Sequence, residues 1–375
     1  MTPLVNAGPA SAGPVARARD VCLRSEVLLG RLSIDLPRSL LQSNLGEFNA
    51  EFAERVFAEA FQARRASVGD IELCQLRPDT MLHGGGDFLV TSGGAELDEQ
   101  VPPALRHDPD RRRDILQTSR PVVEIHSPCV IVARYGEGTW GHWLGELIPR
   151  AALAEYFRPG EFNFVVPEWM TRRGAAGGLS SAALDSLAAF GVAESRLIRV
   201  DSGQDYRLAN AWMVAPIWSD HIPHPAAMDI LRAIPPRLET VLLPRKLAVQ
   251  RHGPSRRLDN SADIAGVLAR HGYTSVQLGT LPFDEQVALF REATHVFGTL
   301  GSDFTGLMFS PDHVRVLAAA PADWGDRFFY GLCQLRHGSY SEIRGGFGRR
   351  NEALLRDSTF SIDTNRLDEM LTQMG

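Results

Sequence analysis

The chain has 375 residues, which is more than one ordinary hydrophobic core accommodates and suits two domains. Hydrophobic residues make up 44% and charged residues 22% of the sequence, a balance typical of soluble globular proteins. The net charge of −6 disfavours binding to nucleic acid, because nucleic-acid-binding domains usually carry a basic face.

The first twenty residues predict a disordered leader (1–20), because they are rich in Ala, Gly and Pro and lack the features of a signal peptide. No apolar stretch reaches the length of a membrane span. Widely spaced cysteines without a CxxC pair indicate free thiols in a reducing compartment: Cys22, Cys74, Cys129 and Cys333. We expect a cytoplasmic protein and leave open peripheral association with the inner face of the membrane.

The pattern up to residue 235 predicts a mixed α/β domain over residues 21–235. Helical periodicity is found at 48–66, 140–157 and 180–190, and the last of these ends at Gly191. Apolar strand patterns occur around 81–91, 122–133, 162–167, 197–200 and 211–214. Four prolines between residues 221 and 236 interrupt helices and strands alike, so we place a domain boundary there.

Beyond the boundary, strands and helices alternate through a second domain, residues 236–345. We expect strands at 242–250, 275–278 and 295–297, and helices at 261–271 and 282–293. This alternation is typical of a parallel sheet with helices on both faces. The final segment, residues 346–375, contains an amphipathic helix pattern.

The helix pattern at 140–157 carries the first candidate site, His142, Glu146 and Arg150. Residues four apart share a face of an α-helix, so the three side chains form a row if the helix continues past Pro149. A histidine, a carboxylate and an arginine in line could supply a general base, its orienting partner and an anion ligand. The alternative is a helix face with one ion pair.

The second candidate site is the loop that follows the strand at 295–297. Gly301 permits close approach of a ligand, and Ser302 or Asp303 could cap the helix that follows. A helix start there directs unpaired N–H groups at one point, which suits a phosphate. A packing turn remains the alternative, and Asp303 is either a cap or a base that acts on an acceptor.

Cations and carboxylates in the same half could complete this second site. Arg251, at the end of the strand at 242–250, is the best candidate for binding a diphosphate, because arginine binds phosphates with two parallel hydrogen bonds. Arg256 and Arg257 suit a solvated loop at least as well. Glu285 lies at a helix start, where the helix dipole alone favours acidic residues. The sequence has no HExxH or GxxxxGK[ST] motif, and its one DxD-like string, at Asp108, lies in an arginine-rich loop, so we expect no metal site.

Three blocks in order resemble glycosyltransferase family 61, the DUF563 or capsular-polysaccharide type. They are GHWLGELIPRAALAEYF, LPRKLAVQRHGPSRRLDNSADIAGVLARHGYTSVQLGTL, and LPFDEQVALFREATHVFGTLGSDFTGLMFSPDHVRVLAA. The family loop usually reads like GxHGAxLTN. Here the usual histidine is Leu300 and the usual asparagine is Gly306, whereas Gly301 and Thr305 are retained.

The resemblance implies an α/β, GT-B-like fold, in which two Rossmann-like domains face each other across a cleft. Residues 21–235 would be the acceptor-side domain and 236–345 the nucleotide-sugar-binding domain, with the terminal helix packing back on the first. It implies an inverting transferase that needs no metal or other cofactor and moves a sugar, from a donor we expect to be UDP-linked, to a glycan or glycolipid acceptor.

The resemblance also assigns roles to residues. His142 is the first choice for the catalytic base and Glu146 the second, with Arg150 positioning an anion or the substrate. Arg251 would hold the donor diphosphate together with the segment Gly301, Ser302, Asp303 and Thr305, and Glu285 would accept from a ribose hydroxyl.

The resemblance leaves an alternative function open. The changed loop, with Leu300 and Gly306, would also suit a non-catalytic GT-B-like module that binds a nucleotide sugar or glycan within a biosynthetic complex. The sequence makes no prediction of the sugar, the linkage or the oligomeric state.

Overall fold

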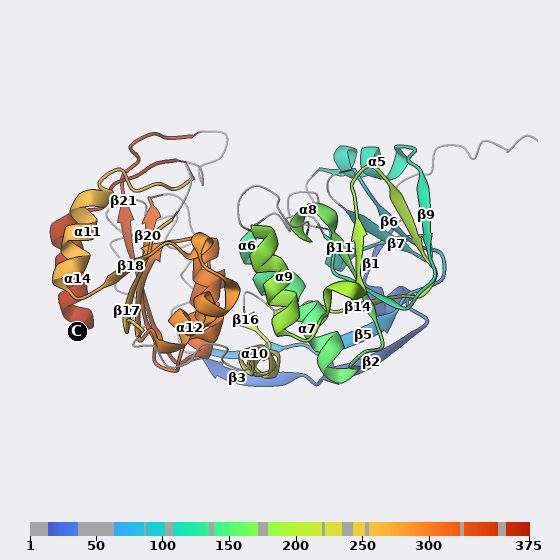
Figure 1. The fold of residues 1–375 in the computed structure, drawn as a ribbon, viewed down its shortest axis with the longest axis horizontal. Coiled ribbons are helices and arrows are strands. Elements are labelled where there is room, and N and C mark those ends of the chain that lie inside the picture. The colour runs from blue at the N-terminus through green and yellow to red at the C-terminus, as the bar shows by residue number, and fades with distance from the viewer. Residues whose placement is uncertain are drawn as a thin grey trace, which may run out of the picture. The chain divides into compact units, whose positions relative to one another are not determined.

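The computed structural model divides the chain into two compact units (Figure 1). Unit 1 comprises Met1–Arg31 and Asp70–Ile217, and unit 2 comprises Leu32–Gly69 and Trp218–Gly375. The structure describes residues 14–36, 64–85, 88–101, 108–134, 139–171, 179–219, 222–234, 243–251, 255–322, 326–351 and 358–375. Both units are mixed α/β structures that contain parallel strands.

Unit 1 contains two six-stranded sheets among its described residues. The first sheet has the order β1 (Val15–Ala16), β8 (Ala95–Leu97), β7 (Leu89–Ser92), β6 (Thr80–His83), β13 (Asp205–Leu208) and β9 (Val122–Ile125). The second has the order β12 (Leu197–Val200), β11 (Asn163–Pro167), β10 (Cys129–Ile131), β14 (Ala211–Val214), β5 (Ile71–Gln75) and β2 (Arg24–Leu29). Buried side chains from both sheets form one hydrophobic cluster, which includes Leu82, Ile131 and Met213.

The parallel part of the second sheet positions the first candidate site. Strands β12, β11, β10 and β14 are parallel neighbours, whereas β5 runs antiparallel to β14, and β2, at the edge, runs antiparallel to β5. The chain moves from β10 to β11 and β12 on one side, and β14 lies on the other side of β10. The strand order therefore reverses at β10, and ligands of such sheets bind at the carboxyl ends beside the reversal.

The helices of unit 1 connect these strands. The segment between β10 and β11 contains α6 (Trp140–His142), the π-helical turn η2 (Trp143–Leu147) and α7 (Ile148–Phe157). Next come α8 (Glu168–Thr171) and α9 (Leu179–Ala189), which connect β11 to β12. Contacts of α7 with β10 and β14 place this helix over the reversal point. Short elements complete the unit: α1 (Ala18–Val21), η1 (Asp98–Gln100), α5 (Pro109–Gln117) and η3 (Glu194–Arg196).

Unit 2 contains a five-stranded, all-parallel sheet. Its order is β18 (Thr274–Val276), β17 (Lys246–Val249), β19 (His295–Thr299), β20 (Arg315–Pro321) and β21 (Ser339–Gly345). Numbered along the chain this is the order 2-1-3-4-5, which reverses between β17 and β19. The loops after these two strands therefore meet at the reversal point, and they carry Arg251 and Gly301.

Helices cover both faces of this sheet (Figure 1). On one face lie α11 (Ser261–Arg270) and α14 (Thr364–Met374), and on the other α12 (Phe283–Glu292), the 3₁₀ helix η5 (Ser302–Phe309) and α13 (Phe328–Leu335). The short helix η4 (Leu278–Thr280) lies between β18 and α12. Unit 2 also contains α10 (Pro225–Arg232) and two hairpins, β3 (Leu32–Leu36) with β4 (Arg64–Val68) and β15 (Trp218–Ser219) with β16 (Ile222–Pro223).

The division of the chain differs from the expected division at residue 235. The second unit begins at Trp218, and it also takes residues 32–69 from within the first half. The reason is a small hydrophobic cluster, in which Ile34, Ala66 and Val68 of the hairpin pack with Ile222. Local periodicity could not predict a contact between segments so far apart.

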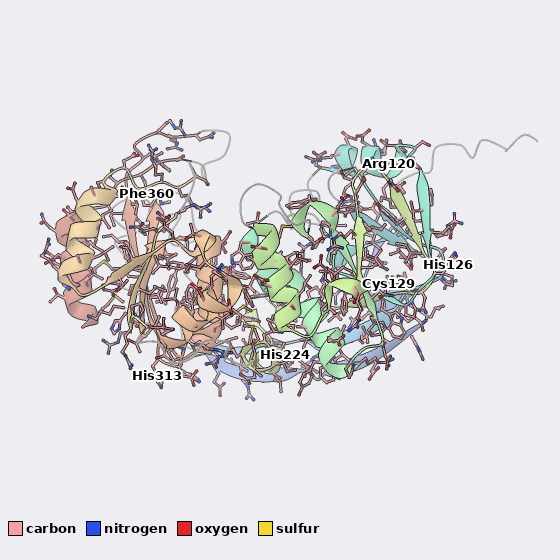
Figure 2. The ribbon with its side chains drawn as sticks, viewed as in Figure 1. Arg120, His126, Cys129, His224, His313 and Phe360 are labelled. Atoms are coloured by element: carbon pink, nitrogen blue, oxygen red, sulfur yellow. The ribbon has the colours of Figure 1, made fainter. Side chains whose placement is uncertain are left out.

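The C-terminal helix also lies elsewhere than expected, because α14 packs against α11 within unit 2. Leu367, Met370 and Leu371 join a cluster over the sheet that includes Phe360, which is labelled in Figure 2. The apolar stripe that indicated an amphipathic helix was correct, but a stripe does not specify the partner that covers it.

The structure describes only parts of two further predicted segments, the leader at 1–20 and the helix at 48–66. Residues 1–13 of the predicted leader lie outside the described residues, but the rest of it is ordered: β1 pairs with β8, and α1 follows. Most of the predicted helix at 48–66 also lies outside them, and its last residues, from Arg64, belong to strand β4. Within the described parts of the chain, none of the helices is both long and apolar enough to cross a bilayer.

Replacing Leu371 tests the placement of α14. Its side chain is 2% exposed, so Leu371→Ala should lower the free energy of unfolding by about 2–5 kcal/mol. Hydrogen exchange should accelerate in α11 and β17–β21 but not in β10–β14. The exposed residue Gln373 provides a control, Gln373→Ala, that should change neither; faster exchange in unit 1 alone would contradict the placement.

Candidate functional site

The first site lies on the connection that leaves the carboxyl end of β10. Pro149, in the first turn of α7, has no N–H group, and its ring would clash with the carbonyl four residues before it in a regular α-helix. The chain relieves this conflict with the π-helical turn η2, in which the N–H of Ile148 donates to the carbonyl of Trp143. The Trp143 ring is buried and donates from Nε1 to Ser186 Oγ of α9 at 3.0 Å, which fixes the turn.

The carboxylate of Glu146 is the centre of this site. Oε1 accepts a hydrogen bond from His142 Nδ1, and Oε2 accepts one from Arg134 Nη1. A carboxylate only accepts, so Nδ1 carries the proton and Nε2 of neutral His142 is the basic nitrogen. The His142 side chain is 50% exposed, whereas those of Glu146 and Arg134 are 21% and 12% exposed. The predicted pair of His142 and Glu146 therefore forms, with an accessible imidazole.

The surroundings keep Glu146 ionised. Burial alone would raise the pKa of its carboxyl, but the hydrogen bond from His142 and the charges of Arg134, His142 and Arg150 lower the pKa to about 2. An ionised carboxylate at this position accepts the Nδ1 proton of His142 and so orients the imidazole.

Arg150 does not continue the row, contrary to the expectation from four-residue spacing. It is 1% exposed, and its Nη2 donates to the backbone carbonyl of Glu99 at 3.2 Å. Its Nε and Nη1 have no hydrogen-bond partner among the described residues. Burial and the charge of Arg134 lower the pKa of Arg150 to about 10. The physical reason is the π turn, which changes the angle between successive side chains and breaks the α-helical row.

Arg134 takes the place beside Glu146 that the sequence assigned to Arg150. The sequence offered one signal for it, since Arg134 is the first charged residue after the apolar run Cys129–Ala133. The carboxyl end of a parallel strand is where polar groups meet a ligand.

The second site lies between the loops that follow β17 and β19 in unit 2. A side chain at Gly301 would bring its Cβ within 3.0 Å of Arg256 Nη2 and still closer to Arg251 Nη1. Both guanidinium groups therefore press against the bare backbone of Gly301. Arg251 is held in place by a hydrogen bond from Nε to the carbonyl of Ser255, at 2.7 Å. The structure thus brings together Arg251 and Gly301, as the sequence predicted.

Arg256 also belongs to this site, although its sequence context suited a solvated loop at least as well. Its side chain is buried, and its backbone has a positive φ of 52°, a conformation that is uncommon for residues with a side chain. Backbone strain of this kind tends to be kept where surrounding contacts require it. Nothing in the local sequence signals that burial, because Gly301, against which Arg256 packs, lies on another loop.

The start of η5 differs in detail from the predicted cap. Gly301 itself is the N-cap, without a side-chain cap hydrogen bond, and Ser302 and Asp303 are half-buried residues of the first turn. The N–H of Phe304 donates to the carbonyl of Gly301 at 2.9 Å. Thr305 is fully buried, and its Oγ1 has no hydrogen-bond partner among the described residues.

The two positions where the loop departs from the family pattern are packing positions. Leu300 is fully buried, and its N–H donates to the carbonyl of Ala319 of β20 at 2.8 Å. A Cβ at Gly306 would collide with the ring of Phe290 of α12. Glu285 is half-buried in the first turn of the same helix.

Residues 140–317 match the family model described as Glycosyltransferase 61. This region is a glycosyltransferase family 61 domain. It extends from α6 into β20 and contains His142, Glu146, Arg251 and Gly301, whereas Arg134 precedes it. A comparison with curated proteins found no match.

Among solved structures, the chain is similar to a dodecameric iron-containing heptosyltransferase, TibC, in complex with ADP-D-beta-D-heptose. The sequences are 11% identical, the match covers 88% of this chain and 84% of that chain, and the TM-score is 0.28. This similarity is too distant to bear on the fold or the function.

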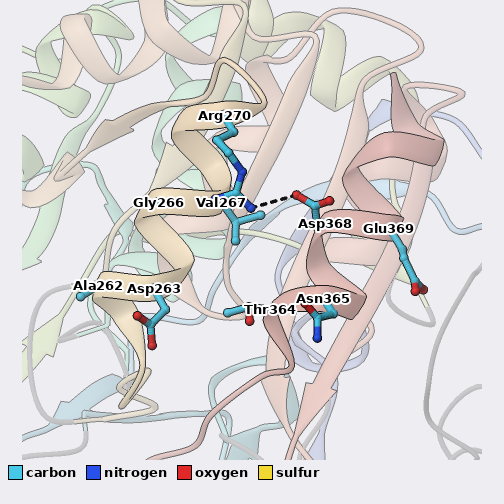
Figure 3. A pocket seen from close by; sticks show the side chains of 9 residues that line it. All are labelled: Ala262, Asp263, Gly266, Val267, Arg270, Thr364, Asn365, Asp368 and Glu369. Carbon is cyan, nitrogen blue, oxygen red and sulfur yellow. Dashed lines mark hydrogen bonds and ion pairs between the residues drawn. The ribbon is translucent and has the colours of Figure 1, made fainter.

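A pocket of about 680 Å³ lies between α11 and α14, outside the two sites of the glycosyltransferase domain (Figure 3). Its lining includes Asp263, Asp368 and Glu369, and its Arg270 is paired with Asp368 at 3.2 Å. Carboxylates repel phosphates, so the pocket does not suit a nucleotide. Within the described residues, His, Cys, Asp and Glu side chains form no group of three or more that could hold a metal ion.

The low pKa of Glu146 predicts how its contribution to stability depends on pH. The ordinary pKa is 4.5 and the folded value about 2, so the stabilisation is complete above pH 4.5 and is lost as the pH falls towards 2. The unfolding free energies of the wild type and Glu146→Gln, from urea unfolding, should differ by about 3 kcal/mol more at pH 7 than at pH 2. The exposed Glu161→Gln is the control, and a pH-independent difference for Glu146→Gln would contradict the assignment.

Proposed function

We propose that this protein is an inverting, metal-independent glycosyltransferase that moves a sugar from a nucleotide-sugar donor to a glycan acceptor. The hydrogen-bonded chain Arg134–Glu146–His142, at the carboxyl end of β10, is the observation that carries the proposal. A histidine oriented by an ionised carboxylate is the arrangement by which enzymes remove a proton from a hydroxyl group.

In the proposed reaction, His142 Nε2 accepts the proton of the acceptor hydroxyl as its oxygen attacks the anomeric carbon. The bond from that carbon to the diphosphate breaks, and the diphosphate leaves with the electron pair. Attack opposite the leaving group inverts the anomeric centre. Glu146 stabilises the imidazolium that forms; its pKa of about 2 makes it a weak base, which supports His142 as the base.

The donor diphosphate is proposed to bind at the reversal point of the unit 2 sheet. Arg251 and the backbone from Gly301 to Asp303, with Thr305, would hold its charge, and Arg256 adds a second guanidinium. Cationic side chains and a helix start stabilise a leaving diphosphate without a metal ion, in agreement with the lack of a convincing DxD motif. Glu285 is proposed to accept a hydrogen bond from a ribose hydroxyl. A role for Asp303 as a base that acts on the acceptor remains an alternative.

The finer features of this proposal come from the family. They are a GT-B-like arrangement of two Rossmann-like domains, a UDP-linked hexosyl or pentosyl donor, and a role in surface or capsular polysaccharide biosynthesis. A cytoplasmic location, peripheral to the inner face of the membrane, would suit a glycolipid acceptor.

A second candidate is a non-catalytic module that binds a nucleotide sugar or glycan. The observation that favours it is the burial of Leu300 and the packing of Gly306 against Phe290, at positions where the family usually has polar side chains. The two candidates differ in whether nucleotide binding is followed by turnover.

Calorimetry against UDP, GDP, CMP and their sugars, with and without EDTA, tests the proposal first. We expect micromolar binding of one nucleotide that EDTA does not change. His142→Ala should then reduce transfer by at least 100-fold, with nucleotide affinity within about twofold, because a general base acts on the acceptor alone. Binding without turnover in the wild type would favour the non-catalytic module, and normal turnover in His142→Ala would exclude His142 as the base.

Two variants test the donor site. Arg251→Ala should weaken binding of the nucleoside diphosphate by about 1.5–3 kcal/mol, the scale of a charge-assisted contact. Gly301→Ala should have a similar effect, because its Cβ would displace the guanidinium of Arg251. Gly279→Ala is the matched control, since its Cβ would meet no atom within 4 Å. Unchanged affinity in both Arg251→Ala and Gly301→Ala would remove this loop from the donor site.

A further inference from the structure

The helix between β10 and β11 changes its hydrogen-bond pattern at the His142–Glu146 pair. Residues before Trp143 and after Leu147 are α-helical, and the turn between them is a π turn closed from Ile148 to Trp143. Pro149 follows at once, and it lacks the N–H that would continue an α-helical pattern. Single π turns within α-helices are rare and are often found at functional sites.

The π turn decides which cation Glu146 meets. In an uninterrupted α-helix, Arg150 would lie on the same face as Glu146, four residues on, and would compete with His142 for its carboxylate. Arginine is permanently charged and binds carboxylates with two parallel hydrogen bonds, so it would be the stronger competitor. In the structure Arg150 turns inward and donates to the carbonyl of Glu99 instead.

The charged side chains near His142 come from the adjoining π turn and from three other segments of the chain. Glu146 lies on the π turn, Arg134 on the loop after β10, Arg150 on α7 and Glu99 on η1. The carboxylate of Glu99 is already engaged, since it accepts from the N–H of Ala18 at 3.0 and 3.1 Å. Glu146 is therefore the carboxylate of this group on which Arg134, Arg150 and His142 could converge.

We propose that Pro149 is a positioning residue for the His142 base. By enforcing the π turn, it keeps Arg150 away from Glu146, so that one carboxylate oxygen binds His142 Nδ1 and the other binds Arg134. The inference rests on the proposed function only in making His142 the base; the arrangement itself can be measured without any substrate.

Pro149→Ala restores the missing N–H and tests the inference. The helix should become α-helical, and Arg150 should displace His142 from Glu146. In the ¹⁵N NMR spectrum of the imidazole, the signature of a hydrogen-bonded Nδ1–H, present in the wild type, should be lost. Turnover should fall by at least about tenfold while KM for the donor stays within about twofold, as expected when the support of a catalytic group is removed. The melting temperature should stay equal or rise, because the helix gains a hydrogen bond.

Two further variants separate positioning from packing. Pro149 is buried, and Pro149→Val restores the N–H with little loss of volume, so it should match Pro149→Ala if the hydrogen-bond pattern is the cause. Pro109→Ala is the matched control, because Pro109 starts α5 in a first turn, where proline fits without distortion. It should change neither the His142 spectrum nor turnover.

The outcomes distinguish this inference from the proposed function. An unchanged Nδ1 signature in either folded Pro149 variant overturns the inference, whether or not the protein transfers sugar. Absence of transfer in the wild type, with the Nδ1 signature lost in both variants, overturns the proposed function and leaves the arrangement standing. In the wild type alone, absence of a scalar coupling between the Ile148 N–H and the Trp143 carbonyl would also overturn the inference, so the test does not depend on the variants folding.

Discussion

The carboxylate of Glu146 holds the first site together. Its two oxygens bind Arg134, from the loop after β10, and His142, from the following helix. This single group thus ties a strand end to the helix that crosses over it, and it fixes which nitrogen of the imidazole carries the proton. The hydrogen bond from His142 and the charge of Arg134 compensate for the burial of the carboxylate, which would otherwise favour its protonated form. The imidazole remains half-exposed, as a group that must reach a substrate requires.

The second site depends on the absence of a Cβ atom at Gly301. Two guanidinium groups approach the backbone at Gly301, and any side chain there would push them away. Two like charges held close together repel each other, and an anion bound beside them would relieve that repulsion. Arg256, whose side chain is buried and reaches the same point, has a positive φ of 52°. Both sites lie where the order of parallel strands in a sheet reverses, at β10 in unit 1 and between β17 and β19 in unit 2.

Much of the local structure could be predicted from the sequence. The spacing of apolar residues predicted the helices that became α6 to α7, α9, α11 and α12, and the alternation of elements predicted the parallel sheet of unit 2. The pair His142 and Glu146 and the neighbours Arg251 and Gly301 could also be predicted, because each depends on local spacing or on strand ends. Arg256 and the π turn could not, since they depend on a contact between two loops and on how one proline distorts a helix; for Arg134 the sequence offered only its place after an apolar run. The packing partner of α14 and the inclusion of residues 32–69 in unit 2 could not be predicted from the sequence for the same reason.

The inclusion of residues 32–69 in unit 2 affects how the chain can fold during synthesis. The chain leaves unit 1 after β2 and returns at β5, and these strands are paired, with Leu29 opposite Ile71, so unit 1 can close its sheet around the departing hairpin. The pair of strands β3 and β4 cannot pack until the residues that it contacts in unit 2 have been synthesised. For example, the N–H of Gly69, directly after β4, donates to Oγ of Ser219, 150 positions further along the chain. The apolar side chains of the pair, Ile34, Ala66 and Val68, thus stay uncovered while most of unit 1 is being made. A fragment ending near residue 217 would expose this surface permanently, whereas removing residues 32–69 together with the second half would leave strand ends that a short turn could join.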